Sequence, residues 1–237
     1  MNLIEIKNVS KSFDDLKVLD NISLLLNSGE NLAIVGPSGA GKSTLLRIIA
    51  GLEQIDSGEV TVNAKKISMV FQYSALLNSY TVGENIFLAL KNSNFKKNEK
   101  EMKILEMLKL VGLEKYFDYY PDQLSGGQRK RVGFARAIVN NPVVILYDEP
   151  TSGLDPILST LIEEYINKLS KEFKVASFVV THQLSTIKRT ANHVLMLYKG
   201  KFVWEGKPNN FLTTDNPFVK QFVNAEIMGP IETTLLE

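Results

Sequence analysis

The amino-acid sequence predicts an α/β fold: a mainly parallel β-sheet with helices on both faces, a small antiparallel β subdomain near the N-terminus, and an inserted α-helical subdomain. Short apolar runs typical of strands buried on both faces recur at 31–35, 67–71, 143–147 and 175–181. Segments with helical spacing of apolar residues separate these runs, and parallel strands need such crossover connections. Strands that alternate with helices therefore favour a parallel core.

The N-terminal part of the chain supplies the antiparallel strands and the first buried strand. Residues 3–13 and 17–26 read as two strands joined by a polar turn at Asp14 and Asp15, and residues 59–62 read as a further strand. A glycine-rich loop follows the run at 31–35, and residues 43–52 then place leucine and isoleucine on one helical face.

The character of the sequence changes between about residues 73 and 135, where we expect the inserted helical subdomain. Residues 97–111 carry apolar side chains at the spacing of an amphipathic helix, and residues 128–139 read as another helix. Only residues 63–66 separate the strand near Val62 from the next one, which predicts a very short connection.

The last third returns to alternating strands and helices. A helix is expected to start at Asp155-Pro156, with a capping residue and proline in the first turn. A short helix at 184–191 and a hairpin at 194–203 follow. We expect one domain over residues 1–208 and a C-terminal helix and tail over 209–237.

The tail carries an apolar stripe at helical spacing, formed by Phe218, Phe222 and Ala225, with two valines beside it. Lys220, Gln221 and Asn224 are expected to face water. Two placements remain open. The helix packs on its own subunit, or residues 229–232 extend as an arm to a second subunit or an auxiliary protein.

Composition excludes several classes of protein. Lys and Arg number 27 against 26 Asp and Glu, so the basic excess typical of nucleic-acid binders is missing. The absence of cysteine rules out disulfides and thiolate metal sites. No apolar stretch approaches the roughly 18 residues of a membrane span, and the alternating N-terminus does not resemble a signal peptide. Action at a membrane would therefore require a partner.

The glycine-rich loop fits the phosphate-binding pattern G-x-x-x-x-G-K-[ST]. Glycines let backbone N–H groups turn towards phosphate oxygens, and the following helix directs its positive end to the same place. Lys42 supplies a charge to the terminal phosphates, and Ser43 offers a hydroxyl to Mg²⁺. A chance glycine-rich turn is the alternative, but the strand before and the helix after favour the motif. The loop consists of Gly36, Pro37, Ser38, Gly39, Ala40, Gly41, Lys42, Ser43 and Thr44.

Two carboxylates end the apolar run at 143–147. Asp148 is expected to hold Mg²⁺ through water, and Glu149 to orient and deprotonate the attacking water. By itself this pattern would equally describe a solvated acidic turn. Beside a phosphate loop it indicates hydrolysis.

Leu124-Ser125-Gly126-Gly127-Gln128 opens the helix at 128–139, between the phosphate loop and the acidic strand. Serine and glycines at a helix start form a second anion site, although a plain capped helix start has the same composition. With this LSGGQ sequence the chain resembles the ABC ATPase family over residues 2–208.

The resemblance implies further roles. Gln72 matches the glutamine that senses Mg²⁺ and reports to the membrane subunit, and Asp155 closes the loop that meets the opposite subunit. His182 matches the switch histidine near the terminal phosphate, and Phe13 occupies the place of an aromatic ring against adenine. His182 as a structural residue and Phe13 as a core residue are the alternatives. The family usually has about twenty more residues where this chain has 63–66.

Three segments are similar to the ATPases of Mla-type phospholipid transporters, also called the Mkl branch: residues 71–85, 196–201 and 216–231. This resemblance implies an ATPase with ATP and Mg²⁺ as cofactors, working as a homodimer on integral-membrane permease subunits at the cytoplasmic face of an inner membrane. Phospholipid would move between the inner and outer membranes, with a periplasmic lipid-binding subunit and a small cytoplasmic auxiliary subunit as further partners. Another importer, of an amino acid or an ion, and a soluble iron–sulfur assembly ATPase are the alternatives.

Overall fold

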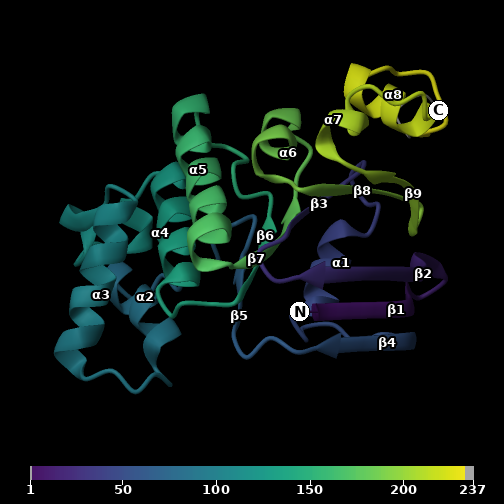
Figure 1. Cartoon of the computed structure of the whole chain (residues 1–237). Coiled ribbons are helices and arrows are strands. Elements are labelled where there is room, and N and C mark those ends of the chain that lie inside the picture. The colour runs from purple at the N-terminus through teal and green to yellow at the C-terminus, as the bar shows by residue number, and fades with distance from the viewer. Residues whose placement is uncertain (1, 233–237) are drawn as a thin grey trace.

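The computed structural model describes residues 2–232 and confirms the predicted α/β class (Figure 1). Its strands are β1 (Asn2–Phe13), β2 (Leu16–Asn27), β3 (Asn31–Val35), β4 (Ser57–Val62), β5 (Ile67–Val70), β6 (Val144–Asp148), β7 (Ala176–Val180), β8 (His193–Tyr198) and β9 (Lys201–Gly206). Its α-helices are α1 (Lys42–Ile49), α2 (Val82–Phe87), α3 (Lys97–Leu110), α4 (Gly126–Ile138), α5 (Pro156–Phe173), α6 (Leu184–Thr190), α7 (Pro208–Phe211) and α8 (Pro217–Asn224). Short 3₁₀ helices cover Leu88–Leu90, Glu114–Tyr116 and Pro121–Gln123.

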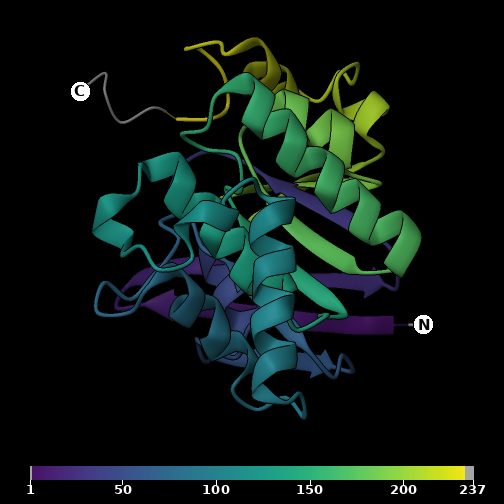
Figure 2. The same cartoon turned by 90° about the vertical axis from the view of Figure 1, so that its left-hand side faces the viewer.

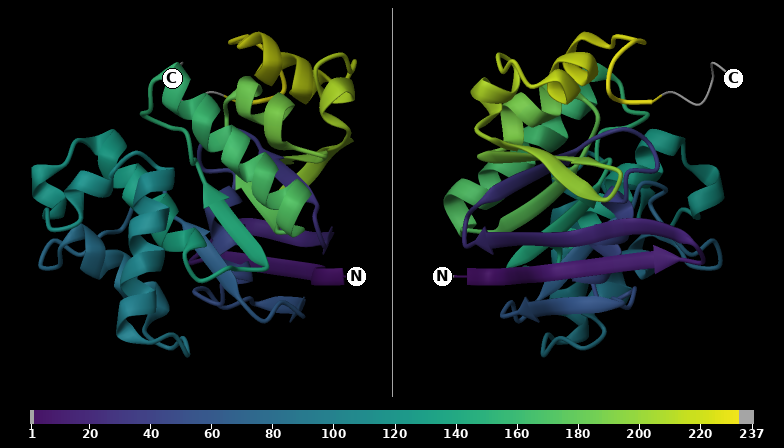
Figure 3. Two further views of the ribbon diagram at one scale, coloured as in Figure 1. Left: turned by 60° about the vertical axis from the view of Figure 1, so that its left-hand side comes forward. Right: turned by 90° about the vertical axis from the view of Figure 1, so that its right-hand side faces the viewer.

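The central sheet has the strand order β5-β6-β7-β3-β8-β9, and only β9 runs antiparallel to its neighbour. A second, three-stranded antiparallel sheet has the order β2-β1-β4 (Figure 3). Residues 63–66 connect the two sheets. β4, which precedes them, pairs with β1 of the antiparallel sheet, and β5, which follows them, pairs with β6 of the central sheet.

Alternating side chains of the parallel strands explain the layers. Leu32 and Ile34 of β3 join a core cluster with α1 and the antiparallel sheet, so α1 lies between the two sheets. Ala33 and Val35 face the opposite side, where they pack with α6 and the C-terminal helices. β3, β6 and β7 are buried at every position, as their continuous apolar runs predict, whereas β5 at the edge of the sheet is only half-buried over residues 67–69.

Helices α2, α3 and α4 form the side of the molecule that faces the viewer in Figure 2. Their apolar residues share one cluster with α5 and with Ile145, Tyr147 and Val179 of the central sheet. The helical insert is therefore packed onto the sheet through α4 and α5.

The C-terminal helix packs on its own subunit. Phe218 lies 5.2 Å from Tyr198 between ring centroids, and Phe222 lies 6.4 Å from Phe211. Ile231 is buried in the same cluster, and Lys199 pairs with Glu232 at 2.8 Å. Residues 229–232 therefore do not form an arm, and residues 233–237 of the predicted tail lie outside the described residues.

The prediction that Gln221 faces water is wrong, because its side chain is only 4% exposed. Its Nε2 donates to the Ile231 carbonyl at 2.9 Å, and its Oε1 accepts from the Ile231 N–H at 2.6 Å. Helical spacing alone assigned Gln221 to the outer face. The chain folds back after α8 and covers that face with residues 227–231.

Replacing Gln221 with alanine should lower the free energy of unfolding by roughly 1–3 kcal/mol, since two buried backbone groups of Ile231 would lose their partners. Denaturant unfolding of the full chain measures the change. Asn224→Ala, an exposed amide on the same helix, is the control and should have little effect. Equal stability of the two variants would contradict a stabilising role for the hydrogen bonds between Gln221 and the Ile231 backbone.

Candidate functional site

The predicted site residues follow neighbouring parallel strands and so gather at one edge of the central sheet. Gly36 follows β3, Asp148 ends β6, and His182 lies two residues after β7. Gln72 lies two residues after β5 at the same edge and is half-buried. The carboxyl ends of parallel strands are where ligands bind in open α/β sheets.

The phosphate loop has a backbone that only glycine permits at two positions. Gly36 has φ 144° and Gly41 has φ 100°. A Cβ at Gly36 would collide with the Leu197 carbonyl, and one at Gly41 would lie 2.7 Å from the Val18 carbonyl oxygen. This conformation keeps the loop compact at the start of α1, whose positive end suits anionic phosphates.

Lys42 lies inside this loop. Its Nζ donates to the carbonyls of Gly36 at 2.8 Å and Pro37 at 2.7 Å. Burial lowers the pKa of the ammonium, and the carboxylates of Glu149 and Asp148 oppose that change. The charge is therefore held where the terminal phosphates of a nucleotide are expected.

Ser43 and Asp148 approach each other across the loop and β6. Ser43 Oγ donates to Asp148 Oδ1 at 3.0 Å. Burial raises the pKa of the Asp148 carboxyl, while the hydrogen bond from Ser43 lowers it. A hydroxyl beside a carboxylate is the oxygen donor set that Mg²⁺ accepts.

Glu149 and His182 form the second polar pair at this edge. Glu149 Oε1 lies 2.8 Å from His182 Nδ1, while Oε2 is buried with no hydrogen-bond partner among the described residues. The Glu149 backbone is left-handed, with φ 51°, and its N–H donates to the Val180 carbonyl at 2.9 Å. Such a backbone is costly and is often retained at functional sites. An unpartnered carboxylate oxygen fits a site that receives a water molecule.

Ser125, Gly126, Gly127 and Gln128 lie apart from these groups. Ser125 caps α4 by accepting from the Gln128 N–H at 3.2 Å, and Gln128 Oε1 accepts from the Ser125 N–H at 2.8 Å. Within residues 2–232 no hydrogen bond joins this segment to residues 36–44. Ser125 and Gly126 are exposed, so the segment predicted to form a second anion site faces outward.

Phe13 and Asp155, two residues predicted to contact the nucleotide, have well-defined contacts of their own. Phe13 is 44% exposed, so it is not a core residue, and Lys11 Nζ lies 4.9 Å from its ring centroid. Asp155 caps α5 by accepting from the N–H groups of Ile157 and Leu158 at 2.9 and 3.0 Å. Its capping role, predicted from the Asp-Pro pair, is confirmed.

Sequence reasoning missed the side chains of α4 that tie the insert to the site. Lys130 Nζ donates to the carbonyls of Ser152 and Glu149, the latter at 3.4 Å. Arg136 donates to the carbonyls of Ser74 and Ala75, both at 2.7 Å, and so anchors the segment after Gln72. Their acceptors are backbone carbonyls, which no sequence pattern reveals.

The sequence and the fold of this chain are similar to those of known proteins. The family model described as ABC transporter matches residues 19–152. The chloroplastic protein TRIGALACTOSYLDIACYLGLYCEROL 3 of Arabidopsis thaliana is 41% identical, over 97% of this chain and 75% of that protein. Methionine import ATP-binding protein MetN of Clostridium tetani is 39% identical, over 97% of this chain and 77% of that protein.

A solved structure is similar as well. It is a dimeric, post-hydrolysis state of the ATP-binding cassette MJ0796 bound to ADP and Pi, with a TM-score of 0.81 and 34% identity over 86% of this chain and 98% of that one. No helix within residues 2–232 is long and apolar enough to span a bilayer. ABC cassettes dimerise and pair with membrane permease subunits. The chain belongs to the ABC transporter family, as its ATP-binding and ATP-hydrolysing subunit.

Proposed function

We propose that this chain energises the movement of phospholipid between inner and outer membranes, bound peripherally at the cytoplasmic face of the inner membrane. The observation that carries the proposal is the 41% identity, across almost the whole chain, to a protein named after a glycolipid. The Mla-like segments at 71–85, 196–201 and 216–231 support the same cargo class. Methionine import is the second candidate, since a methionine import protein is nearly as similar.

The permease would dock on the surface formed by residues 72–90. Tyr73, Leu77, Tyr80 and Phe87 are exposed in this segment, which therefore offers large apolar side chains that a partner could cover. Arg136 holds the backbone of this segment against α4. A movement of α4 would therefore reach the docking surface directly.

Each ATP would be bound between two subunits of a homodimer. Residues 36–44 of one subunit would hold the phosphates, with Phe13 against adenine, and Ser125, Gly126, Gly127 and Gln128 of the other would close the site. The loop that ends at Asp155 would meet the opposite subunit beside it. The outward exposure of Ser125 and the dimeric state of the similar cassette support this arrangement.

Hydrolysis would depend on three groups at the sheet edge. Glu149 accepts the proton of the attacking water, and its unpartnered Oε2 is the oxygen available for it. His182 orients Glu149 through the 2.8 Å contact, and Lys42 stabilises charge on the terminal phosphate. Ser43, Asp148 and Gln72 would hold Mg²⁺, which neutralises phosphate charge. Loss of the terminal phosphate lets the dimer reopen.

Glu149→Gln should slow ATP hydrolysis by about 10²- to 10⁴-fold, the usual contribution of a general base, and leave ATP binding intact. The amide keeps the shape of the side chain but cannot take a proton from water. Steady-state turnover and nucleotide titration measure the two effects. Near-normal turnover would remove Glu149 from this role.

Two inactive variants should restore activity when mixed. Lys42→Ala removes charge from the phosphate loop, and Ser125→Arg blocks closure on the partner's ATP. In a mixed dimer one site carries both defects and the other carries neither. Turnover of the mixture, with mixed dimers verified by two affinity tags, should exceed that of either variant alone. If confirmed mixed dimers show no recovery, sites shared between subunits are contradicted, provided that one site can act alone.

The cargo can be tested on the complex isolated from native membranes. A tagged chain should be recovered from the inner-membrane fraction together with a permease, and mass spectrometry should find bound phospholipid. With the purified complex in detergent, added phospholipid should stimulate ATP hydrolysis and added methionine should not. Stimulation by methionine would favour the importer. Recovery of the chain from the soluble fraction, without a permease, would favour the iron–sulfur assembly ATPase.

A further inference from the structure

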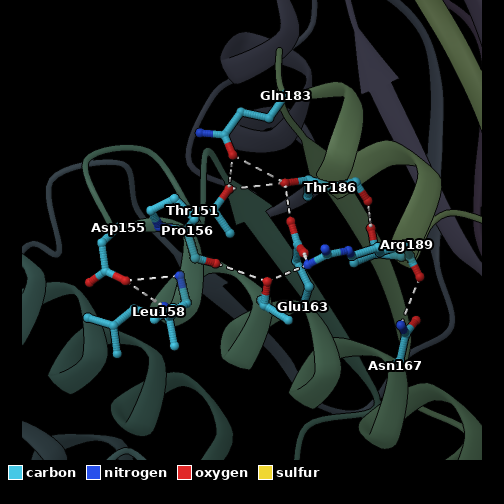
Figure 4. Close-up of polar contacts among 12 residues, drawn as sticks. Thr151, Asp155, Pro156, Leu158, Glu163, Asn167, Gln183, Thr186 and Arg189 are labelled. Carbon is cyan, nitrogen blue, oxygen red and sulfur yellow. Dashed lines mark hydrogen bonds and ion pairs between the residues drawn. The ribbon is translucent and has the colours of Figure 1, made fainter.

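A buried polar network lies beside the catalytic pair, between α5, α6 and the loop after β6 (Figure 4). At its centre is Glu163 of α5, whose side chain is only 1% exposed. Glu163 Oε1 accepts from Thr186 Oγ1 at 2.7 Å, and Oε2 accepts from Arg189 Nη1 at 2.9 Å. A buried carboxylate is costly without such partners, so both oxygens are satisfied from α6.

The network extends from Thr186 to the two loops that carry Glu149 and His182. Thr151 Oγ1 lies 3.1 Å from Thr186 Oγ1 and 3.0 Å from Gln183 Oε1. Thr151 lies two residues after Glu149, and Gln183 directly follows His182. The hydrogen bonds that end at Glu163 therefore join the segment after Glu149 to the segment after His182.

The number of hydroxyl protons fixes the direction of this chain of bonds. A carboxylate paired with arginine only accepts, so Thr186 must give its one proton to Glu163. Thr186 Oγ1 can then only accept, so any hydrogen bond between the two threonines is donated by Thr151. The single proton of Thr151 goes either to Thr186 Oγ1 at 3.1 Å or to Gln183 Oε1 at 3.0 Å, and both acceptors lie on the segment that follows His182. Glu163 thus keeps Thr186 as an acceptor and makes Thr151 the donor that links the two loops.

We propose that Glu163 is a positioning residue for ATP hydrolysis, which helps to hold Glu149 and His182 at hydrogen-bond distance by fixing Thr186 as the acceptor for Thr151. The proposal rests on the roles proposed above for Glu149 and His182. Glu163 touches neither of them and lies outside the phosphate loop, so its effect should fall on turnover and not on nucleotide binding.

Glu163→Gln tests this inference. The amide cannot accept from both partners: with its oxygen towards Thr186, its N–H₂ group faces the Arg189 donor. We expect kcat to fall about ten- to a hundredfold, as small misplacements of catalytic groups do, with nucleotide affinity within about twofold of wild type. Glu164→Gln, the same change at the exposed neighbour on α5, should leave kcat unchanged. Thermal melting should show both variants folded.

Two double variants separate positioning from a general structural effect. Arg189→Met added to Glu163→Gln removes the opposed donor, so kcat should recover while the amide oxygen still accepts from Thr186. In a His182→Ala background, Glu163→Gln should lower kcat by less than about twofold, because the pair it positions is already broken. Fully multiplicative losses would overturn the proposal.

The turnover of these variants also separates failure of the positioning role of Glu163 from failure of the catalytic roles of Glu149 and His182. Wild-type kcat in Glu163→Gln, with Glu149→Gln and His182→Ala impaired, would overturn the positioning role alone. Normal hydrolysis by Glu149→Gln and His182→Ala would overturn the catalytic roles, and the positioning role with them.

Discussion

Parallel hydrogen bonding between β3, β7 and β6 is the constraint on which the site depends. Ile34 pairs with Val180, and Val180 pairs with Asp148. This register places the loop after Val35, the Asp148–Glu149 pair and the turn before His182 side by side at one edge. Residues more than a hundred positions apart thereby come within hydrogen-bond distance, as in the 3.0 Å contact between Ser43 and Asp148. A shift of one residue in any strand would turn these side chains away from one another.

The same sheet edge supplies only part of the proposed site. It carries the proposed phosphate loop, the Ser43–Asp148 pair proposed to hold Mg²⁺, and a carboxylate oxygen with no partner among the described residues. Ser125 belongs to the helical insert and faces outward, without a hydrogen bond to residues 36–44 within the described chain. Lys130 nevertheless connects α4 to the backbone of Glu149. The helix proposed to contact a nucleotide on a second subunit is thus hydrogen-bonded to the backbone of Glu149, the proposed general base of its own subunit.

Much of this structure follows from local sequence. Apolar runs identify the buried strands, glycines at 36 and 41 identify the phosphate loop, and Asp155 with Pro156 identifies the start of α5. The roles of the individual site residues stay proposals, since geometry shows their proximity and not their chemistry. The fold of the core could be predicted because apolar runs and helix-capping residues are patterns of residues that are adjacent in the sequence.

What the sequence could not predict depends on distant contacts. Helical spacing predicts that Gln221 faces solvent, but its side chain is hydrogen-bonded to the backbone of Ile231 after a reversal of the chain. No sequence motif marks Glu163, although its position one residue after Ile162 and three before Ile166 puts it on the buried face of α5. Acidic side chains are normally exposed, so only knowledge of Thr186 and Arg189 explains its burial.

The central claim is that the edge of the parallel sheet binds ATP and that a second subunit completes the site. A structure of the Glu149→Gln chain with ATP and Mg²⁺ tests this claim most directly. We predict a two-fold dimer in which each ATP contacts residues 36–44 of one subunit and Ser125 to Gln128 of the other. Nucleotide enclosed by one subunit, with Ser125 still facing solvent, would contradict the account.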